Sequence, residues 1–361
     1  MIIFTADTHL TPRVWKSRRD LDGDSFRALN ALRDAVLQIE EPTHVILGGD
    51  VFDAARIDAA TLRAFTEFVD TLFENDIRVY VIQGNHDKDG TAAFAEIQGA
   101  VSLDKTLIEL DGRTFYGLNW MPREELIDTL PTVPACDYLV LHAMFEHLVT
   151  FTGACDLSLD DIPTQVGNVL VGDVHINDVT SLRSTGVCIS PGPLHPCNIE
   201  QQGPHGFYAL PAGAEQWEFH SIPTREIKRF RFIDAGAADT IEQYIEEAQQ
   251  RSLEVYETVQ NLEPIVEIRH SNDLTDLTES WVSKYPGVRF FTKGSATGKL
   301  VTAEDILEAQ QGFQNLTLVE SLDVVVDAGK DAELHAFLGS LLVGDAQATI
   351  DHKLEEVQCD P

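Results

Sequence analysis

Five short polar segments carry the side-chain types that bind divalent metal ions. In chain order they are Asp7-Thr8-His9, Gly48-Gly49-Asp50-Val51-Phe52-Asp53, Gly84-Asn85-His86-Asp87, His142 and Gly172-Asp173-Val174-His175. Each segment alone is weak evidence for a metal site, because an Asp-x-His is commonly a turn and a histidine in an apolar run is commonly a core residue. Together, carboxylate, imidazole and amide ligands without thiolate suit Mn²⁺, Fe²⁺ or Zn²⁺. Two such ions about 3.5–4 Å apart activate water and hold phosphate oxygens, so the set predicts a two-metal phosphoesterase.

Each of these segments directly follows a predicted strand. Short apolar runs at residues 2–6, 44–47, 79–82, 115–118, 138–141 and 168–171 alternate with helical patterns, which indicates an α/β fold. The helical patterns cover residues 24–40 and 58–74, each with one apolar face. Ligands of α/β proteins gather at the carboxyl ends of strands. We therefore expect the five segments to meet at one site.

The pattern changes near Pro223. Residues 179–223 look β-rich, whereas residues 225–233, 239–251, 264–269, 273–285 and 288–292 alternate as strand, helix, strand, helix and strand. This run predicts a small second domain. From about residue 301 the chain is predicted to be mostly helical, and one apolar face there comprises Leu334, Phe337, Leu338, Leu341 and Leu342. That face either packs within its own tail or docks on a partner helix.

The chain of 361 residues, 43% of them apolar, favours one large domain plus smaller ones. No apolar run approaches the ~20 residues that a membrane-spanning helix needs, and the N-terminus lacks the basic region of a signal peptide. Five cysteines without a Cys-x-x-Cys pair argue against a disulfide framework or a zinc ribbon. We expect the cysteines to be reduced and to have no functional role, including Cys197 beside His195. We also expect a cytoplasmic protein.

The charge restricts how the protein binds nucleic acid. The chain carries 26 Lys and Arg against 59 Asp and Glu, a formal net charge of −33. Proteins that bind nucleic acid unaided usually carry a basic surface, because neutralising phosphates supplies most of the affinity. If this protein acts on DNA, metal ions, a local basic patch or a partner must supply the positive field. The alternative is an acidic, soluble protein from a salty or crowded setting.

The ordered set of motifs resembles the calcineurin-like metallophosphoesterase superfamily. Leu10 after Asp7-Thr8-His9, residues 157–163 ahead of Gly172, and Ser190-Pro191-Gly192-Pro193 followed by Glu200 and Gly206-Phe207 resemble the Mre11/SbcD nucleases. The resemblance covers residues 1–210 by motif and 225–361 only by element order. It implies a two-sheet β sandwich flanked by helices as a nuclease domain (1–223), then an α+β capping domain (224–298). A helical tail (299–361) would bind a Rad50/SbcC-like ATPase.

The resemblance also implies a role for each polar residue. Two divalent ions, Mn²⁺ with Mg²⁺ as the alternative, would be held by Asp7, His9, Asp50 and His175 and by Asp50, Asn85, His142 and Asp173, with Asp50 as the bridge. His86 would protonate the leaving oxygen or steady the transition state, and Asp53 and Asp87 would orient histidines. The family's fourth motif is Gly-His-x-His, whereas this chain has Gly172-Asp173-Val174-His175. Asp173 therefore either binds the second metal less tightly than a histidine or points elsewhere.

Two basic segments are candidates for substrate contact. Arg13, Lys16, Arg18 and Arg19, interleaved with Trp15, would hold phosphates while Trp15 stacks on a base; the other interpretation is a solvated loop. Arg225, Lys228, Arg229 and Arg231 form a second cluster, which is equally consistent with the solvent face of a strand.

The sequence thus predicts a manganese-dependent 3′–5′ exonuclease and endonuclease, working with a Rad50/SbcC-like ATPase in DNA repair or recombination in a bacterial or phage-infected cell. A homodimer through the two early helices would fit the family. One alternative is a stand-alone phosphoesterase acting on small phosphodiesters such as cyclic nucleotides. Another is a regulatory scaffold for an ATPase, with a weakened metal site. Protein phosphatases are disfavoured, because Gly84-Asn85-His86-Asp87 replaces their Gly-Asn-His-Glu motif.

Overall fold

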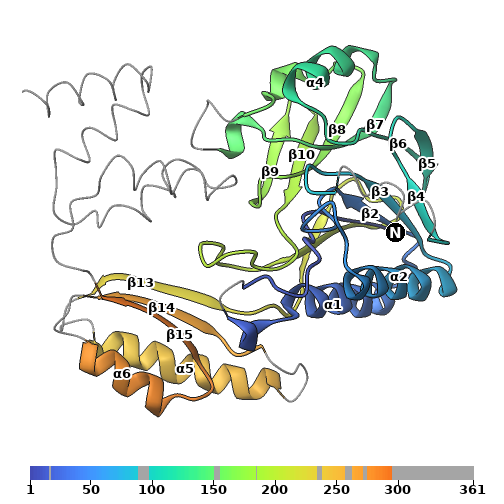
Figure 1. Ribbon diagram of the computed structural model, residues 1–361. Helices are drawn as coiled ribbons and strands as arrows, with labels where there is room; N and C mark the ends of the chain where they lie inside the picture. Colours follow the sequence, from blue (N-terminus) through green and yellow to red (C-terminus); the bar gives the residue numbers. More distant parts are fainter. Residues whose placement is uncertain are drawn as a thin grey trace, which may run out of the picture.

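The computed structural model describes residues 1–15, 18–87, 97–149, 155–183, 185–233, 238–256, 262–270 and 275–294. Within these residues the chain forms two six-stranded sheets and one three-stranded sheet, with helices on their faces (Figure 1). None of the helices in the described part is long and apolar enough to cross a membrane. The predicted tail and its apolar face at Leu334–Leu342 lie outside the described residues.

The first sheet has the strand order β12-β11-β1-β2-β3-β4. Four strands are parallel to one another: β1 (Ile2–Thr5), β2 (His44–Gly48), β3 (Arg78–Ile82) and β4 (Ala100–Ser102). Strand β11 (Gly206–Leu210) pairs antiparallel with β1 and with β12 (Glu218–Ser221). Helices α1 (Asp24–Gln38) and α2 (Ala59–Glu74) connect the parallel strands and pack their apolar faces on one side of the sheet (Figure 1).

The second sheet has the order β5-β6-β7-β8-β10-β9. Its central strands β6 (Arg113–Gly117), β7 (Cys136–His142), β8 (Val166–Gly172) and β10 (Gly186–Pro191) are parallel. The edge strands β5 (Leu107–Leu110) and β9 (Asn177–Leu182) pair antiparallel with their neighbours. Helix α4 (Arg123–Thr129) packs over the outer face through Leu126.

The two sheets pack face to face. Ile2, Phe4 and Ile46 of the first sheet share one buried cluster with Phe115, Val140 and Leu170 of the second. Alternate residues of the same strands, such as Ile3 and Val45, face the helices instead. Because successive strand residues point to opposite faces, these strands are apolar on both sides. This architecture confirms the prediction of a two-sheet sandwich flanked by helices.

The third sheet follows the predicted alternation of strands and helices. Strands β13 (Ile227–Ile233), β14 (Ile265–His270) and β15 (Arg289–Gly294) are parallel, and helices α5 (Ala238–Tyr256) and α6 (Thr275–Lys284) connect them. Both helices cover one face of the sheet, through Ile241, Ile245 and Trp281 (Figure 1). The alternate residues Ile227 and Ile265 pack on the other face, against Trp15 and Leu21 of the first 223 residues.

A buried ion pair joins the segment just before β13 to helix α1. The guanidinium of Arg225 donates to both carboxylate oxygens of Asp24 at 2.7 and 2.8 Å, and Arg27 and the indole of Trp15 donate to the same carboxylate at 2.7 Å. The Arg225 side chain is 0% exposed. Burial opposes ionisation of Asp24, but the bonds from Arg225 outweigh it and lower the pKa of this carboxyl. Arg225, a member of the second basic cluster, is therefore buried and does not lie on the solvent face of a strand.

Candidate metal centre

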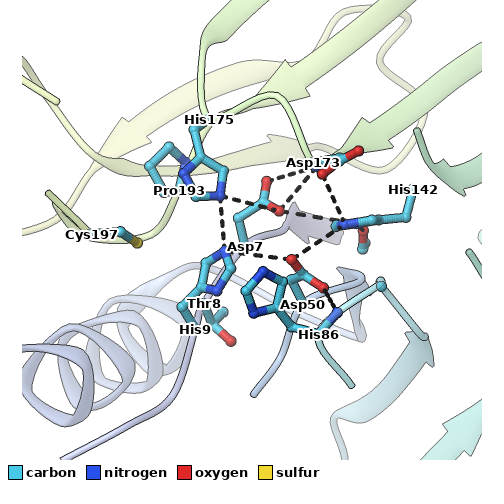
Figure 2. A network of polar contacts seen from close by, with 12 residues as sticks. Asp7, Thr8, His9, Asp50, His86, His142, Asp173, His175, Pro193 and Cys197 are labelled. Carbon is cyan, nitrogen blue, oxygen red and sulfur yellow. Dashed lines mark hydrogen bonds and ion pairs between the residues drawn. The ribbon is translucent and has the colours of Figure 1, made fainter. Parts of the chain in front are cut away.

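The five polar segments meet at the carboxyl ends of β1, β2, β3, β7 and β8, where the edges of the two large sheets lie together. Figure 2 shows their side chains converging on one centre. The backbone amide of Asp7 donates to Gly49 O at 3.1 Å and that of His9 to Asp50 O at 2.9 Å, so the loops after β1 and β2 hold each other. The expectation that these strand ends meet is thus fulfilled by the fold.

The backbone at this centre is left-handed at five of the predicted ligands. The φ angles are +51° at Asp7, +38° at His9, +48° at Asp50, +94° at Asp173 and +55° at His175. Residues other than glycine adopt this region rarely, and Asp, Asn and His adopt it most readily. Such conformations persist only where surrounding structure enforces them, and they cluster at functional sites.

His9 and His175 form one half of the centre. Their Nε2 atoms lie 2.8 Å apart. His9 Nε2 is 3.6 Å from Asp50 Oδ2, and His175 Nε2 is 3.9 Å from Asp7 Oδ1. The side chains of Asp7 and Asp50 are 0% and 2% exposed. The four residues predicted to share a first metal are therefore adjacent; Asp7, His9 and Asp50 are shielded from solvent, whereas the side chain of His175 is 25% exposed.

His142 forms the other half. Its Nε2 lies 3.1 Å from Asn85 Oδ1, 3.5 Å from Asp50 Oδ2 and 3.7 Å from Asp173 Oδ1. Its Nδ1 lies 2.9 Å from Gly48 O, a contact in which the ring nitrogen donates to the carbonyl. A histidine held in this way presents the lone pair of its other nitrogen to a metal. Asp50 Oδ2 faces both His9 and His142, which is the position that a bridging carboxylate needs.

Asp173 lies on the His142 side of the centre. Its backbone amide donates to both carboxylate oxygens of Asp7, at 3.0 and 3.1 Å, while its own carboxylate faces His142. The side chain does not point elsewhere. Its ligation of a metal ion remains a prediction.

The charges at this centre depend strongly on one another. Burial raises the pKa of Asp7 to about 7 and that of Asp173 to about 6; His142 lowers both pKa values and the carboxylate of Asp50 raises them. Burial also opposes ionisation of Asp50 and His142, but their mutual attraction lowers the pKa of Asp50 and raises that of His142. A bound cation changes this balance, because it favours every ionised carboxylate near it.

His86 and Asp53 lie beside the His9 half. The ring of His86 packs edge-to-face on His9, with centroids 5.0 Å apart, and its Nδ1 donates to the Asp53 carbonyl at 2.8 Å. The backbone amide of His86 donates to Asp50 Oδ1 at 2.9 Å. The Asp53 carboxylate lies 3.5 Å from His9 Nδ1, where it can orient that ring.

Asp87 has a different position from the one expected. Its carboxylate accepts hydrogen bonds from the backbone amides of Val51, at 2.7 Å, and Gly84, at 2.6 Å. Burial raises the pKa of Asp87 to about 6. The side chain therefore holds together the loops after β2 and β3 and orients backbone amides instead of a histidine ring.

The basic segment after the first loop lies against the third sheet. Trp15 is 7% exposed, its indole donates to Asp24, and its ring lies 6.4 Å from that of Phe291, so it offers no face to a base. Arg18 donates twice to Asp20 and once to the Phe290 carbonyl. Arg13 and Arg19 are exposed, whereas Lys16 lies outside the described residues. Trp15 is therefore not available to stack on a base. It has a structural role instead, because it packs against the third sheet.

Three further residues reach this centre that the sequence did not assign to it. Gln201 Nε2 lies 2.6 Å from His175 Nδ1, and His195 Nε2 lies 3.0 Å from the Thr8 carbonyl. The thiol of Cys197, expected to have no role, has its sulfur within 4.8 Å of ring nitrogens of His9 and His175. Burial raises the pKa of this thiol well above its ordinary value. No spacing rule links these residues to the five motifs.

The arrangement fits divalent cations bound by oxygen and nitrogen. Two groups of potential ligands contain Asp50: one with Asp7 and His142, the other with His9 and His86. Two glycines permit the side chains of Asp50 and His142 to lie this close to neighbouring backbone. A Cβ at Gly84 would lie 2.0 Å from Asp50 Oδ1, and one at Gly49 would lie 2.4 Å from His142 Nδ1. The sandwich fold and this ligand set define a metal-dependent phosphoesterase.

The comparison with known families agrees. The sequence profile described as "Calcineurin-like phosphoesterase" matches residues 1–210, which is more than half of the chain. The chain therefore belongs to the calcineurin-like phosphoesterase family.

Two curated proteins similar to this chain are both Mre11 proteins. The chain is 31% identical over 87 residues to the DNA double-strand break repair protein Mre11 of Nanoarchaeum equitans, covering 24% of each chain. It is 27% identical over 142 residues to that of Methanocaldococcus jannaschii, covering 36% of this chain and 38% of the relative. These similarities confirm the predicted resemblance but span well under two thirds of the relatives. A solved archaeal phosphodiesterase is 14% identical, with a TM-score of 0.35, covering 61% of this chain and 99% of the other.

Proposed function

We propose that the protein is a nuclease that hydrolyses phosphodiester bonds of DNA with two divalent ions, Mn²⁺ or Mg²⁺. The observation that carries this proposal is the position of Asp50 Oδ2, 3.6 Å from His9 Nε2 and 3.5 Å from His142 Nε2. One carboxylate thus faces two groups of ligands, as a bridge between two ions requires. Residues 1–223 would form the nuclease domain, 224–298 the capping domain and 299–361 a tail.

The chain's own residues have distinct tasks in this reaction. Asp7, His9, Asp50 and His175 would hold one ion, and Asp50, Asn85, His142 and Asp173 the other. Bound ions supply charge neutralisation at the phosphate and activation of the attacking water. His86, whose Nδ1 donates to the Asp53 carbonyl, would protonate the leaving oxygen or steady the transition state. Asp53 would keep the ring of His9 in place.

The DNA must be attracted despite the net charge of −33. Of the basic segment, only Arg13 and Arg19 are exposed within the described residues. We therefore propose that a Rad50/SbcC-like ATPase supplies much of the positive surface, binding through the tail. A homodimer through α1 and α2 is consistent with the exposed apolar side chains of Leu37 and Leu62, which are 37% and 38% exposed.

The test is hydrolysis in the presence of Mn²⁺ of labelled duplex DNA, single-stranded DNA and bis-p-nitrophenyl phosphate. His86→Ala should abolish DNA degradation. His220→Ala, which removes a histidine on β12, is the matched control and should leave the rate unchanged. Activity on the small ester alone would instead support a stand-alone phosphoesterase. Inactivity on every substrate, with and without a partner ATPase, would contradict the proposal and favour a regulatory scaffold.

A further inference from the structure

The carboxyl end of β6 lies at the same edge of the second sheet as His142. Strand β6 pairs in parallel with β7, and the Leu118 amide just after β6 donates to Val140 O at 2.9 Å. Strand β7 ends two residues later, in His142. The residues that follow Leu118, Asn119 and Trp120, therefore lie at the level of the metal centre, although neither is a predicted ligand.

The same segment is bonded to the loop that carries the predicted ligand Asn85. The Trp120 amide donates to Gln83 O at 2.7 Å, and the Gln83 amide donates to Asn119 Oδ1 at 2.8 Å. The Asn119 amide donates in turn to Asp104 Oδ1 at 2.9 Å. Gln83 is two residues before Asn85 in the chain. The backbone of Trp120 is therefore fixed between the loop of Asn85 and the end of β7.

Trp120 differs from the other three tryptophans of the chain. Trp15, Trp217 and Trp281 each pack within or against a buried apolar cluster, whereas Trp120 belongs to none of the clusters formed by the described residues. Trp120 is partly exposed. Tryptophan is enriched at binding surfaces, because its ring is large and apolar and carries one polar group. Core packing does not account for a tryptophan at this position.

The residues that follow Trp120 are poorly suited to holding a phosphate. Glu124, Glu125 and Asp128 of α4 are exposed, and Arg123 is the only basic residue of that helix. Phosphates are attracted by an excess of positive charge, which this helix lacks. A nucleobase carries no such charge, and its stacking on an aromatic ring contributes affinity of its own. The chemistry of this segment therefore favours a base over a phosphate as its ligand.

We propose that Trp120 stacks on a nucleobase of the substrate, next to the phosphodiester bond at the metal centre. The inference rests on the proposed nuclease function and deepens it, because it adds a contact with the bases of the strand. Stacking would also contribute affinity that does not depend on a basic surface, which matters for a chain with a net charge of −33. Every base has an aromatic face, so the contact would select for the presence of a base and not for its identity.

The experiment compares two single-stranded oligonucleotides of equal length, one of deoxyadenosine units and one of abasic units, hydrolysed by the full-length chain with Mn²⁺. The wild type should prefer the deoxyadenosine strand by roughly 5- to 150-fold in kcat/KM, the usual contribution of stacking one base. Trp120→Ala should remove most of this preference by raising KM for that strand, with a much smaller change on the abasic strand. Trp120→Phe keeps an aromatic face and should retain most of the preference.

The matched control is Phe219→Ala, which removes a partly exposed aromatic side chain of β12. It should leave the preference unchanged, with circular dichroism verifying that every variant is folded. A wild type that hydrolyses both strands equally, or a Trp120→Ala variant that keeps the preference, would overturn the stacking role. Equal losses on both strands in Trp120→Ala would also overturn it, because they would indicate a purely structural role.

Binding of the two strands with Ca²⁺ in place of Mn²⁺, measured by fluorescence anisotropy, separates this inference from the proposed function. A preference for the deoxyadenosine strand that Trp120→Ala removes, without hydrolysis in Mn²⁺, would overturn the nuclease function and support the stacking role. Hydrolysis without any preference in binding would do the reverse. A wild type that neither binds nor hydrolyses either strand would overturn both.

Discussion

The Nε2 atoms of His9 and His175 lie 2.8 Å apart, although 166 positions separate these residues in the chain. His9 follows a strand of the first sheet, and His175 follows a strand of the second. Nitrogen ligands lie about 2.0–2.1 Å from an ion such as Zn²⁺, so two adjacent ligands of one ion are about 3 Å apart. An ion bound here would therefore connect the two sheets of the sandwich.

Metal binding is expected to raise the thermal stability of the protein. Binding to the folded state alone adds about 2.7 kcal/mol to the free energy of unfolding when free Mn²⁺ is 100 times its dissociation constant. Calorimetry with Mn²⁺ and with EDTA should show the higher unfolding temperature with the metal. His175→Ala should reduce the difference, whereas His220→Ala should preserve it. An equal unfolding temperature with and without metal in the wild type would argue against this site.

Asp173 should determine how the second ion is bound. We expect Asp173→Ala to remove one of two Mn²⁺ equivalents in a calorimetric titration, because only Asn85, His142 and the shared Asp50 remain. Asp173→His, which recreates the family's Gly-His-x-His pattern, should retain two equivalents and tighten the weaker one. A wild-type titration that shows one tight ion and no second would refute the ligand role of Asp173.

Trp15 should matter for stability and not for DNA binding. Because the ring is 7% exposed between the sheets, Trp15→Ala should cost about 3–5 kcal/mol of unfolding free energy. Trp15→Phe keeps most of the packing but loses the bond to Asp24, with an expected cost of about 1 kcal/mol. Urea unfolding measures both costs, and a fluorescence titration with single-stranded DNA should give equal affinities for Trp15→Phe and the wild type. A large loss of DNA affinity in Trp15→Phe would restore the stacking role.

The ion pair of Asp24 with Arg225 should make stability depend on pH below about 4. The folded pKa of Asp24 lies below its ordinary value. Its contribution is therefore fully present above the unfolded pKa and is lost as the pH falls through the folded pKa. Asp24→Asn should cost about 3–5 kcal/mol at pH 7, because it removes the carboxylate that accepts two bonds from the buried guanidinium of Arg225 and leaves it the longer contact with Glu263, at 3.6 Å.

Urea unfolding at pH 7 and near pH 3 checks this expectation. The difference between the wild type and Asp24→Asn should shrink at the lower pH. Glu74→Gln, which changes an exposed carboxylate on α2, should behave as the wild type at both values. A difference that stays constant with pH would show that the pair contributes nothing through ionisation.

The sequence predicted six strands of the two large sheets, because the ligand segments and the apolar runs are both local patterns. It did not predict β4 and β5, which are short and largely exposed, or the order of the strands within each sheet. The third sheet was also predicted, since each of its strands and helices has its own periodicity. The fate of Trp15 and Arg225 was not predictable, because both meet Asp24 only when the third sheet packs on α1. The same holds for Gln201, which contacts a histidine 26 positions away through a turn with no motif of its own.

The left-handed backbone at the predicted ligands has a consequence for how this centre can change during evolution. Aspartate and histidine are among the few side chains that tolerate such φ angles, and they are also good ligands. A β-branched replacement would add conformational strain, of order 1–3 kcal/mol, to the loss of the ligand. Substitutions that persist are therefore drawn from a short alphabet of Asp, His, Asn and Gly. Asp173, with φ of +94°, stands where the Gly-His-x-His pattern that the chain resembles has a histidine, so this difference is an exchange within that alphabet.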